Sequence, residues 1–216
     1  MKILSSHDLR RIGMALLLTV VCGTSMAIDA PTGVVRQAVG QIIDVLKRKD
    51  ASHTEKWSEI GKLIDTHFDF RSMSQSILAT RWQAASKAEK RQFVEYLAQY
   101  LEVTYREKFE AYTDQRIEYA KETLKKDHAV VDTFIVSNVN RIPVTYKLRL
   151  NGEQWIAYDV VIDGLSLVNN FRDTFEAIVK SEGMGGLLRD LEGKIANYKA
   201  HHGGHVPADT ENHPHP

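Results

Sequence analysis

Residues 155–179 read WIAYDVVIDGLSLVNNFRDTFEAIV, and this stretch decides the fold. Its first part, residues 155–162, is rich in aromatic and β-branched side chains, which favour a strand. The pair Asp163-Gly164 indicates a turn. From Leu165 onward apolar residues recur every three or four positions, which predicts an amphipathic helix. A strand buried on at least one face therefore leads into a helix that folds back over the sheet. Together they are expected to form the floor and one wall of an apolar cavity.

The residues before this stretch alternate between apolar and polar side chains, as in an antiparallel sheet with one buried face. Asn151-Gly152 predicts a tight hairpin between the last two strands. The predicted strands span residues 116–124, 129–136, 144–150 and 155–162.

Helical spacing is found on both sides of the predicted strands. Ser52 with Glu55 and Ser86 with Glu89 are capping-box pairs, which mark helix starts. The predicted helices cover residues 32–48, a segment from Ser52, a segment from Asp69 to about Trp82, residues 86–112, and two segments on either side of a loop at 183–186. Helices, then four strands, then helices predict an α+β fold, with a four-stranded antiparallel sheet covered by helices.

The first 27 residues have the composition of a cleaved signal peptide. Lys2, Arg10 and Arg11 provide a basic start, and residues 12–22 form an apolar run that is short for a bilayer span. Ser25-Met26-Ala27 fits a cleavage site, so cleavage after Ala27 is expected. The alternative is an N-terminal membrane anchor. Cleavage would remove the single cysteine, and the mature chain would then have no thiol chemistry.

Charge and composition narrow the functional classes. The 28 basic and 28 acidic residues balance, so the chain has no broad positive field for nucleic acid. Residues 28–199 are expected to form a single domain. Residues 200–216 are rich in histidine, glycine and proline and are expected to be a disordered tail. A metal role for the tail histidines is an alternative, although the tail has no fixed ligand geometry.

The sequence lacks the common catalytic motifs: a Walker loop, GxSxG, HExxH and CxxC. Asp159 and Asp163 are the acid pair to consider as general acid and base, but such aspartates more often bind backbone amides at a turn. Arg172 either pairs with a nearby acid or meets an anionic headgroup at a cavity mouth, where its planar fork suits phosphate. We therefore expect no catalytic residue, no cofactor and no metal.

Several segments together carry a resemblance to a known family. They are Phe68-Asp69-Phe70 with Met73, Leu78 and Trp82, the helix from Phe93 to Tyr105, the strand–turn–helix unit from Trp155 to Val168, and Asn170-Phe171-Arg172. Over about residues 34–196 the chain resembles the MlaC family of periplasmic phospholipid-binding auxiliary components of ABC transporters, also described under toluene tolerance. Three features depart from the family pattern. Ala79 replaces a usual glycine, Phe171 replaces a tyrosine, and the histidine-rich tail is additional.

The resemblance implies a curved, NTF2-like sheet whose helices enclose the acyl chains of a phospholipid. It implies a periplasmic carrier, not an enzyme. The carrier would move lipid between an outer-membrane lipoprotein–porin complex and an inner-membrane MCE-domain protein of an ABC transporter, maintaining outer-membrane lipid asymmetry. Arg172 is expected near the headgroup. The expected lining consists of Tyr100, Tyr105, Phe109, Val131, Ile135, Tyr146, Leu148, Tyr158, Val160, Leu165, Phe171 and Phe175.

Two other classes remain open from the sequence. One is an NTF2-like enzyme that acts on a small apolar substrate with Asp159 or Asp163 as base. The other is an adaptor with a fully packed core that bridges membrane complexes without binding lipid.

Overall fold

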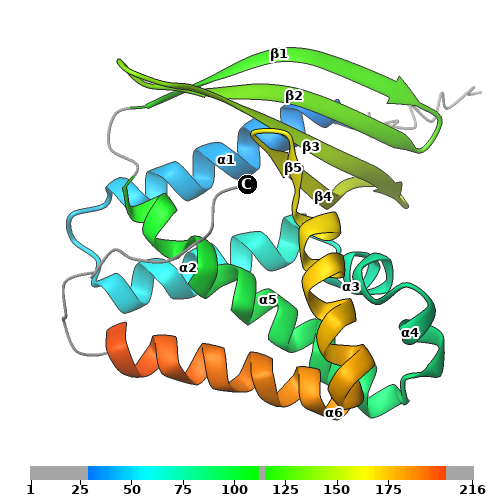
Figure 1. Ribbon diagram of the computed structural model, residues 1–216. Helices are drawn as coiled ribbons and strands as arrows, with labels where there is room; N and C mark the ends of the chain where they lie inside the picture. The colour runs from blue at the N-terminus through cyan, green and yellow to red at the C-terminus, as the bar shows by residue number, and fades with distance from the viewer. Residues whose placement is uncertain (1–28, 112–114, 203–216) are drawn as a thin grey trace, which may run out of the picture.

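The computed structural model describes residues 29–111 and 115–202, and it has a curved antiparallel sheet lying over a layer of helices (Figure 1). The helices are α1 (Pro31–Lys47), α2 (His53–His67), α3 (Phe70–Leu78), α4 (Thr80–Ala84), α5 (Lys87–Glu110) and α6 (Leu167–His202). The strands are β1 (Arg116–Lys125), β2 (His128–Val136), β3 (Arg141–Asn151), β4 (Gln154–Ile162) and β5 (Leu165–Ser166). The predicted α+β class is confirmed.

The sheet has the order β1-β2-β3-β4-β5, and every neighbouring pair is antiparallel. It has five strands, so the expected number of four is corrected. The fifth strand is only Leu165–Ser166, which returns after the turn at Asp163-Gly164 and pairs with Ile162 and Val161. A two-residue strand is too short to produce the alternation from which strands are predicted.

Strand β3 begins earlier than predicted, at Arg141 instead of Val144. The extension contains Pro143, which lies opposite Phe134 of β2. Proline supplies no N–H to a ladder and argues against a strand in sequence. Here its carbonyl accepts a hydrogen bond from the Asp163 amide at 2.9 Å, so the residue still ties β3 to the β4–β5 turn.

Local capping signals correctly predicted the helix starts. Ser52 with Glu55 and Ser86 with Glu89 both form reciprocal capping boxes. Asp69 caps α3 by accepting from the Ser72 amide at 2.8 Å. These bonds satisfy amides that the first helical turn leaves without partners.

The predicted helix from Asp69 to about Trp82 is divided by Ala79 into α3 and α4. Ala79 has φ 47° and ψ −119°, a conformation that favours glycine because a Cβ is crowded there. This is the position at which the resemblance leads one to expect glycine. The backbone geometry therefore gives a physical reason for that preference.

The predicted loop at residues 183–186 is a kink instead, because α6 continues through it with one non-helical residue, Gly183 (φ 70°, ψ −177°). Only glycine adopts this conformation readily. At Gly186 a Cβ would lie 2.2 Å from Cβ of Glu182, so glycine is needed there for close approach. Two glycines thus turn the chain sharply without an intervening loop.

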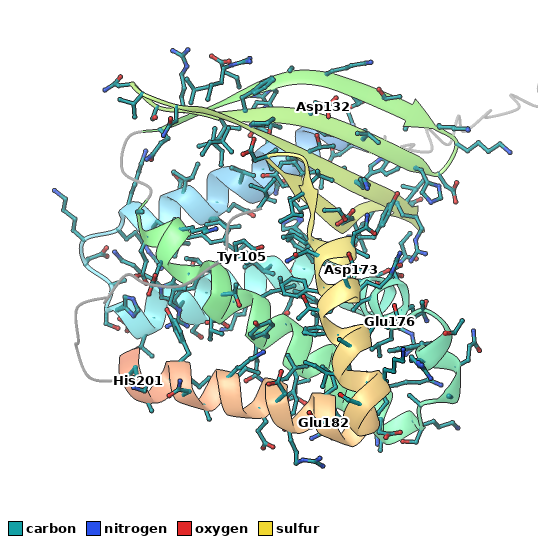
Figure 2. All side chains as sticks on the ribbon, viewed as in Figure 1. Tyr105, Asp132, Asp173, Glu176, Glu182 and His201 are labelled. Atoms are coloured by element: carbon teal, nitrogen blue, oxygen red, sulfur yellow. The ribbon has the colours of Figure 1, made fainter. Side chains whose placement is uncertain are left out.

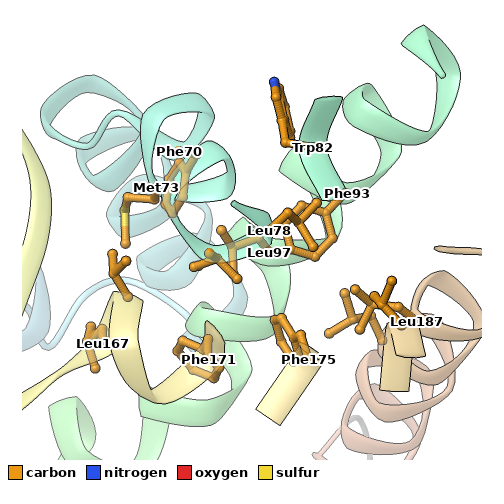
Figure 3. Close-up of a cluster of buried hydrophobic side chains, with 14 of the residues drawn as sticks. Phe70, Met73, Leu78, Trp82, Phe93, Leu97, Leu167, Phe171, Phe175 and Leu187 are labelled. Atoms are coloured by element: carbon orange, nitrogen blue, oxygen red, sulfur yellow. The ribbon is translucent and has the colours of Figure 1, made fainter. Parts of the chain in front are cut away.

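The main core lies among α3, α5 and α6 (Figure 3). Phe93, Leu97, Phe175, Leu187 and Leu191 are inaccessible to solvent. Phe93 meets Phe175 edge to face at 5.9 Å. This core fixes both arms of α6 against α5, and it positions the first arm beside the sheet.

The ends of the chain need one correction. Helix α6 continues to His202, so residues 200–202 are helical and not part of a disordered tail. His201 Nδ1 lies 2.7 Å from the Asn197 carbonyl, one helical turn earlier (Figure 2). The expected signal peptide and the rest of the expected tail lie outside the described residues.

Candidate functional site

The strand pairing defines an inner face of the sheet, which is turned toward the helices. Residues directly opposite one another in an antiparallel pair project to the same side. Val131 lies opposite Tyr146, and Tyr146 lies opposite Val160. The predicted lining residues of the sheet that the register brings together on this face are Val131, Ile135, Tyr146, Leu148, Val160 and Leu165.

Tyr158 does not join them, so its predicted face is corrected. The register shifts in β4, where Lys147 pairs with Asp159 but Leu148 pairs with Ala157. This bulge leaves Tyr158 without an opposite residue and puts it on the outer face, where its ring meets His128 edge to face at 5.8 Å. The inference that Tyr158 and Val160 share a face assumed unbroken alternation, which a one-residue bulge interrupts.

Helices α5 and α6 contribute an aromatic group to the same region. Tyr100 packs edge to face on Phe171 at 5.7 Å and also contacts Phe175 at 6.2 Å. Phe171 and Phe175 stack at 5.4 Å. Three of the predicted lining residues are therefore in mutual contact, and two of them, Phe171 and Phe175, are buried in the main core.

The inner face has two ends that differ in how they are covered. At one end Ala129, Val131, Leu148 and Trp155 are buried against Val35 of α1. At the other end Ile135, Tyr146 and Ile162 are only partly buried. Farther along this end, Ile142 is 37% exposed and Leu165 is 54% exposed. The apolar side chains of the inner face that are most accessible thus lie at this end, although Val144 between Tyr146 and Ile142 is buried.

The arrangement of the helices explains this difference. Helix α1 lies directly beneath the sheet, as Figure 1 shows, and it contacts β1 and β2. Helix α5 instead packs on α6 and α3. The half-buried side chains of Tyr100, Leu101 and Tyr105 on α5 belong to the same apolar group as Ile135 and Tyr146 on the sheet.

Two tyrosines report an apolar environment in this region. Burial raises the pKa of Tyr146 far above its ordinary value, and the nearby Tyr119 adds to the effect. Burial also raises the pKa of Tyr105, with a smaller contribution from Tyr100 (Figure 2). Loss of the phenol proton would place an anion in a poorly solvated space. The site therefore disfavours charge, as expected of a surface suited to apolar ligands.

Phe109 and Arg172 have partners away from this region. Phe109 meets Trp57 of α2 edge to face at 6.3 Å. Arg172 donates from Nε to the Ser76 carbonyl at 2.9 Å, which holds α6 to the last turn of α3. Its partner is a carbonyl, not the acid considered from the sequence. The expected headgroup contact of Arg172 stays a prediction.

Some inner-face residues were not among the predicted lining. Val144 and Ile162 lie opposite each other on this face, and Leu101 adds an α5 side chain. The alternation of β3 already indicated Val144. Ile162 follows from alternation as well, because it lies two residues after Val160, which was among the predicted lining residues.

Asp159 is a structural acid. It is 4% exposed and receives hydrogen bonds from Lys147 Nζ at 2.9 Å, Ser166 Oγ at 2.8 Å and the Val168 amide at 3.2 Å. These bonds join β3, β4, β5 and the start of α6. The interpretation of Asp159 as a ligand of backbone amides is confirmed. A carboxylate with all these donors is poorly placed to act as a base.

The acid of the Phe68-Asp69-Phe70 segment acts in a similar way. Asp69 Oδ2 accepts from Arg149 at 2.6 Å, and the Asp69 amide donates to the Ala157 carbonyl at 2.8 Å. A recess of about 450 Å³ adjoins it, with Asp65, Arg71 and Arg149 among its lining residues. This recess is polar, and none of the predicted lining residues contributes to it.

Within residues 29–111 and 115–202, no three histidine, cysteine, aspartate or glutamate side chains are grouped so as to hold a metal ion. Across the same ranges, every helix is too short or too polar to cross a membrane.

The sequence pattern of the MlaC protein family matches residues 36–193. The chain belongs to the MlaC family. No curated protein matches it. Among solved structures, a phospholipid-binding protein from Ralstonia solanacearum, in complex with a phospholipid, superposes with a TM-score of 0.69 at 21% identity. The match covers 76% of this chain and 96% of that chain. It shows that the two proteins share a fold.

Family membership gives a structural meaning to the segments that carried the resemblance. In this MlaC family member, Asp159, Gly164, Ser166 and Val168 form the junction between the sheet and α6. Asp69 joins α3 to the sheet edge. The recognisable motif therefore consists largely of residues that position the walls of the apolar region, while the apolar lining itself is less distinctive in sequence.

Proposed function

We propose that this chain is a phospholipid carrier that holds acyl chains between the sheet and helices α5 and α6. The observation that carries the proposal is the set of incompletely buried apolar side chains on the inner face, namely Ile135, Tyr146 and Ile142. A soluble domain normally buries its inward-facing apolar groups, so such a surface suits an apolar ligand. The phospholipid in the Ralstonia solanacearum structure of the same fold supports this assignment.

The energetics favour transfer by contact. Burial of each methylene group stabilises by roughly 0.8 kcal/mol, so about 30 methylenes in a diacyl lipid account for over about 20 kcal/mol relative to water. A bilayer provides the same burial. The protein therefore has only to bury the acyl chains about as favourably as a membrane does in order to accept and release lipid. The transfer requires no covalent chemistry. A headgroup left in solvent would make binding depend mainly on the chains.

The same proposal extends to the cellular route. The signal peptide would be cleaved after Ala27, and the single domain within residues 28–199 would act in the periplasm. It would receive and deliver phospholipid between an outer-membrane lipoprotein–porin complex and an inner-membrane MCE-domain protein of an ABC transporter. That route would maintain outer-membrane lipid asymmetry. Membership of the MlaC family supports this assignment.

Mass spectrometry tests the carrier directly. The protein is expressed with its N-terminal segment, purified from the periplasm without detergent, and measured first intact under native conditions and then after denaturation. We expect one diacyl phospholipid per chain that is lost on denaturation, and a polypeptide mass that fits residues 28–216.

Two results would overturn the carrier assignment. The first is protein that is empty on purification and remains empty after incubation with phospholipid vesicles, which would favour an adaptor with a packed core. The second is turnover of an added small apolar substrate that is lost in Asp159→Asn or Asp163→Asn while the variant stays folded, which would favour an enzyme. A polypeptide that retains residues 1–27 would contradict only the cleavage proposal.

A further inference from the structure

One corner of the helical layer carries unpaired positive charge. Residues 71–91 contain five basic side chains but only one acidic side chain, Glu89, in a chain whose total charge balances. The cations are Arg71 of α3, Arg81 of α4 and Lys87, Lys90 and Arg91 of α5. The remainder of the chain is correspondingly acidic, so positive charge is concentrated in this segment of the sequence.

These cations are not used to hold the fold together through ion pairs. Among the described residues, none of the five lies within 4.0 Å of a carboxylate oxygen. Arg71, Arg81, Lys87 and Arg91 are exposed. Asp173 and Glu176 lie on the first arm of α6 (Figure 2), and neither is ion-paired with the cluster.

The one acidic residue of the segment is already engaged. Glu89 accepts from the Ser86 amide at 2.8 Å in the capping box of α5, and this bond together with the Ser86 hydroxyl lowers its pKa. It also lies at the N-terminus of a 24-residue helix, where the peptide dipoles add partial positive charge. Glu89 is therefore engaged by Ser86 and forms no ion pair with the cluster.

The corner lacks the apolar centre that a specific protein interface requires. Trp82 is the large aromatic residue of the segment, but it is 7% exposed. The cationic ends of Arg71 and Lys90 each lie 5.7 Å from its ring. The exposed large apolar residues of the described chain all lie elsewhere, on α5 near its C-terminus, on the sheet and in the loop between β2 and β3. Without a buried anchor, charge is the main source of affinity.

We propose that this corner, defined by Arg71, Arg81, Lys87, Lys90 and Arg91, docks the protein on an anionic phospholipid bilayer. A bilayer surface presents negative charge over a wide area and needs no matching pocket, which fits exposed cations distributed over three helices. The contact would be peripheral, reversible and sensitive to salt. This surface is separate from the apolar region, and the proposal holds whether or not the chain carries lipid.

Vesicle flotation tests the proposal with a charge-reversed variant, Lys87→Glu/Arg91→Glu. Glutamate is favourable in the first turns of a helix, so α5 should form normally. Vesicles contain either phosphatidylcholine alone or about 30% phosphatidylglycerol, which supplies the negative surface potential. The matched control, Lys62→Glu/Lys180→Glu, makes the same change in net charge at two exposed helical lysines outside the cluster.

We expect the unaltered protein and the control to float with the phosphatidylglycerol vesicles at about 20 mM salt and to dissociate at about 200 mM, because salt screens exposed charges. Each basic residue near such a surface contributes roughly fivefold in partitioning, so the double variant should bind at least about 25-fold more weakly. Neither protein should bind phosphatidylcholine alone.

Three results would overturn the proposal: no flotation of the unaltered protein at low salt, an undiminished affinity of the double variant, or an equal loss in the control. Salt-sensitive binding to poly-glutamate without flotation would assign the corner to an acidic protein instead. Native mass spectrometry of the double variant separates this test from the carrier test, since bound phospholipid should be unchanged.

Discussion

The two ends of the inner face of the sheet have similar sequences but different surroundings. At the end beneath α1, Val131 and Leu148 are essentially inaccessible to solvent. At the end near the β2–β3 hairpin, Ile142 and Leu165 point the same way but remain 37% and 54% exposed. Apolar alternation therefore identifies which face of a strand turns inward. Whether that face is filled by protein depends on which helix crosses it.

The largest effect on stability is expected at the filled end. Leu148→Ala leaves a cavity beneath α1 and should lower the free energy of unfolding by about 2–5 kcal/mol. Ile142→Ala, its counterpart at the open end, should cost less than about 1 kcal/mol because the side chain is already partly in water. Urea unfolding of delipidated protein measures both. Equal losses at the two positions would contradict the distinction.

Substitutions at the open end, near the β2–β3 hairpin, should have the largest effect on the amount of phospholipid that the protein retains. Ile142→Asp places a carboxylate where acyl chains are proposed to lie, and desolvation of that charge should reduce retained phospholipid by about tenfold or more. The matched control is Leu124→Asp, an exposed leucine on the β1–β2 hairpin at the other end of the sheet. Phospholipid per chain after purification gives the readout. If both variants keep their lipid, the ligand does not occupy the open end.

A smaller, stabilising change is expected at Ala79, outside both ends. Its positive φ strains an alanine, so Ala79→Gly should raise the free energy of unfolding by about 1 kcal/mol. Retained phospholipid should not change, which makes this variant a reference for the comparison of the two ends. A decrease in the urea midpoint would show that alanine is accommodated there without strain.

The smallest effect on the free energy of unfolding at neutral pH is expected for Tyr146→Phe. This variant tests how apolar the surroundings of Tyr146 are, at the boundary between the two ends of the inner face. The folded protein raises the pKa of Tyr146 above its ordinary value of 10.0. The unfolded chain then releases this proton first, so stability is retained below about pH 10 and falls as the pH rises further. Urea midpoints between pH 7 and pH 11, roughly the range spanning a free phenol's titration, should decline less in Tyr146→Phe. Parallel curves would show that Tyr146 is solvated.

Much of the fold was predictable because its signals are local. Ser52 and Ser86 mark helix starts through bonds to residues only three positions away. Val144, Tyr146 and Leu148 define the buried side of β3 through simple alternation. The same alternation, together with the helical stripe containing Phe171 and Phe175, was sufficient to select most of the inner-face residues.

The parts that were missed depend on relations between strands or on single backbone angles. The bulge that turns Tyr158 outward arises from the pairing of β3 with β4, and the short strand β5 exists only because Ile162 is already in place. The degree of filling at each end of the inner face depends on the position of α1. None of these properties has a local sequence pattern, so they require the assembled chain.

The kink at Gly183 also bears on how the protein opens. Because the helical hydrogen-bond ladder is interrupted there, the two arms of α6 need not fray or exchange amide hydrogens as one unit. The arm before Gly183 carries Phe171 and Phe175 and forms a wall of the apolar region, while the arm after it is anchored in the core through Leu187 and Leu191. A single glycine therefore divides the hydrogen-bond ladder of α6 into two arms, although the same core holds both of them against α5.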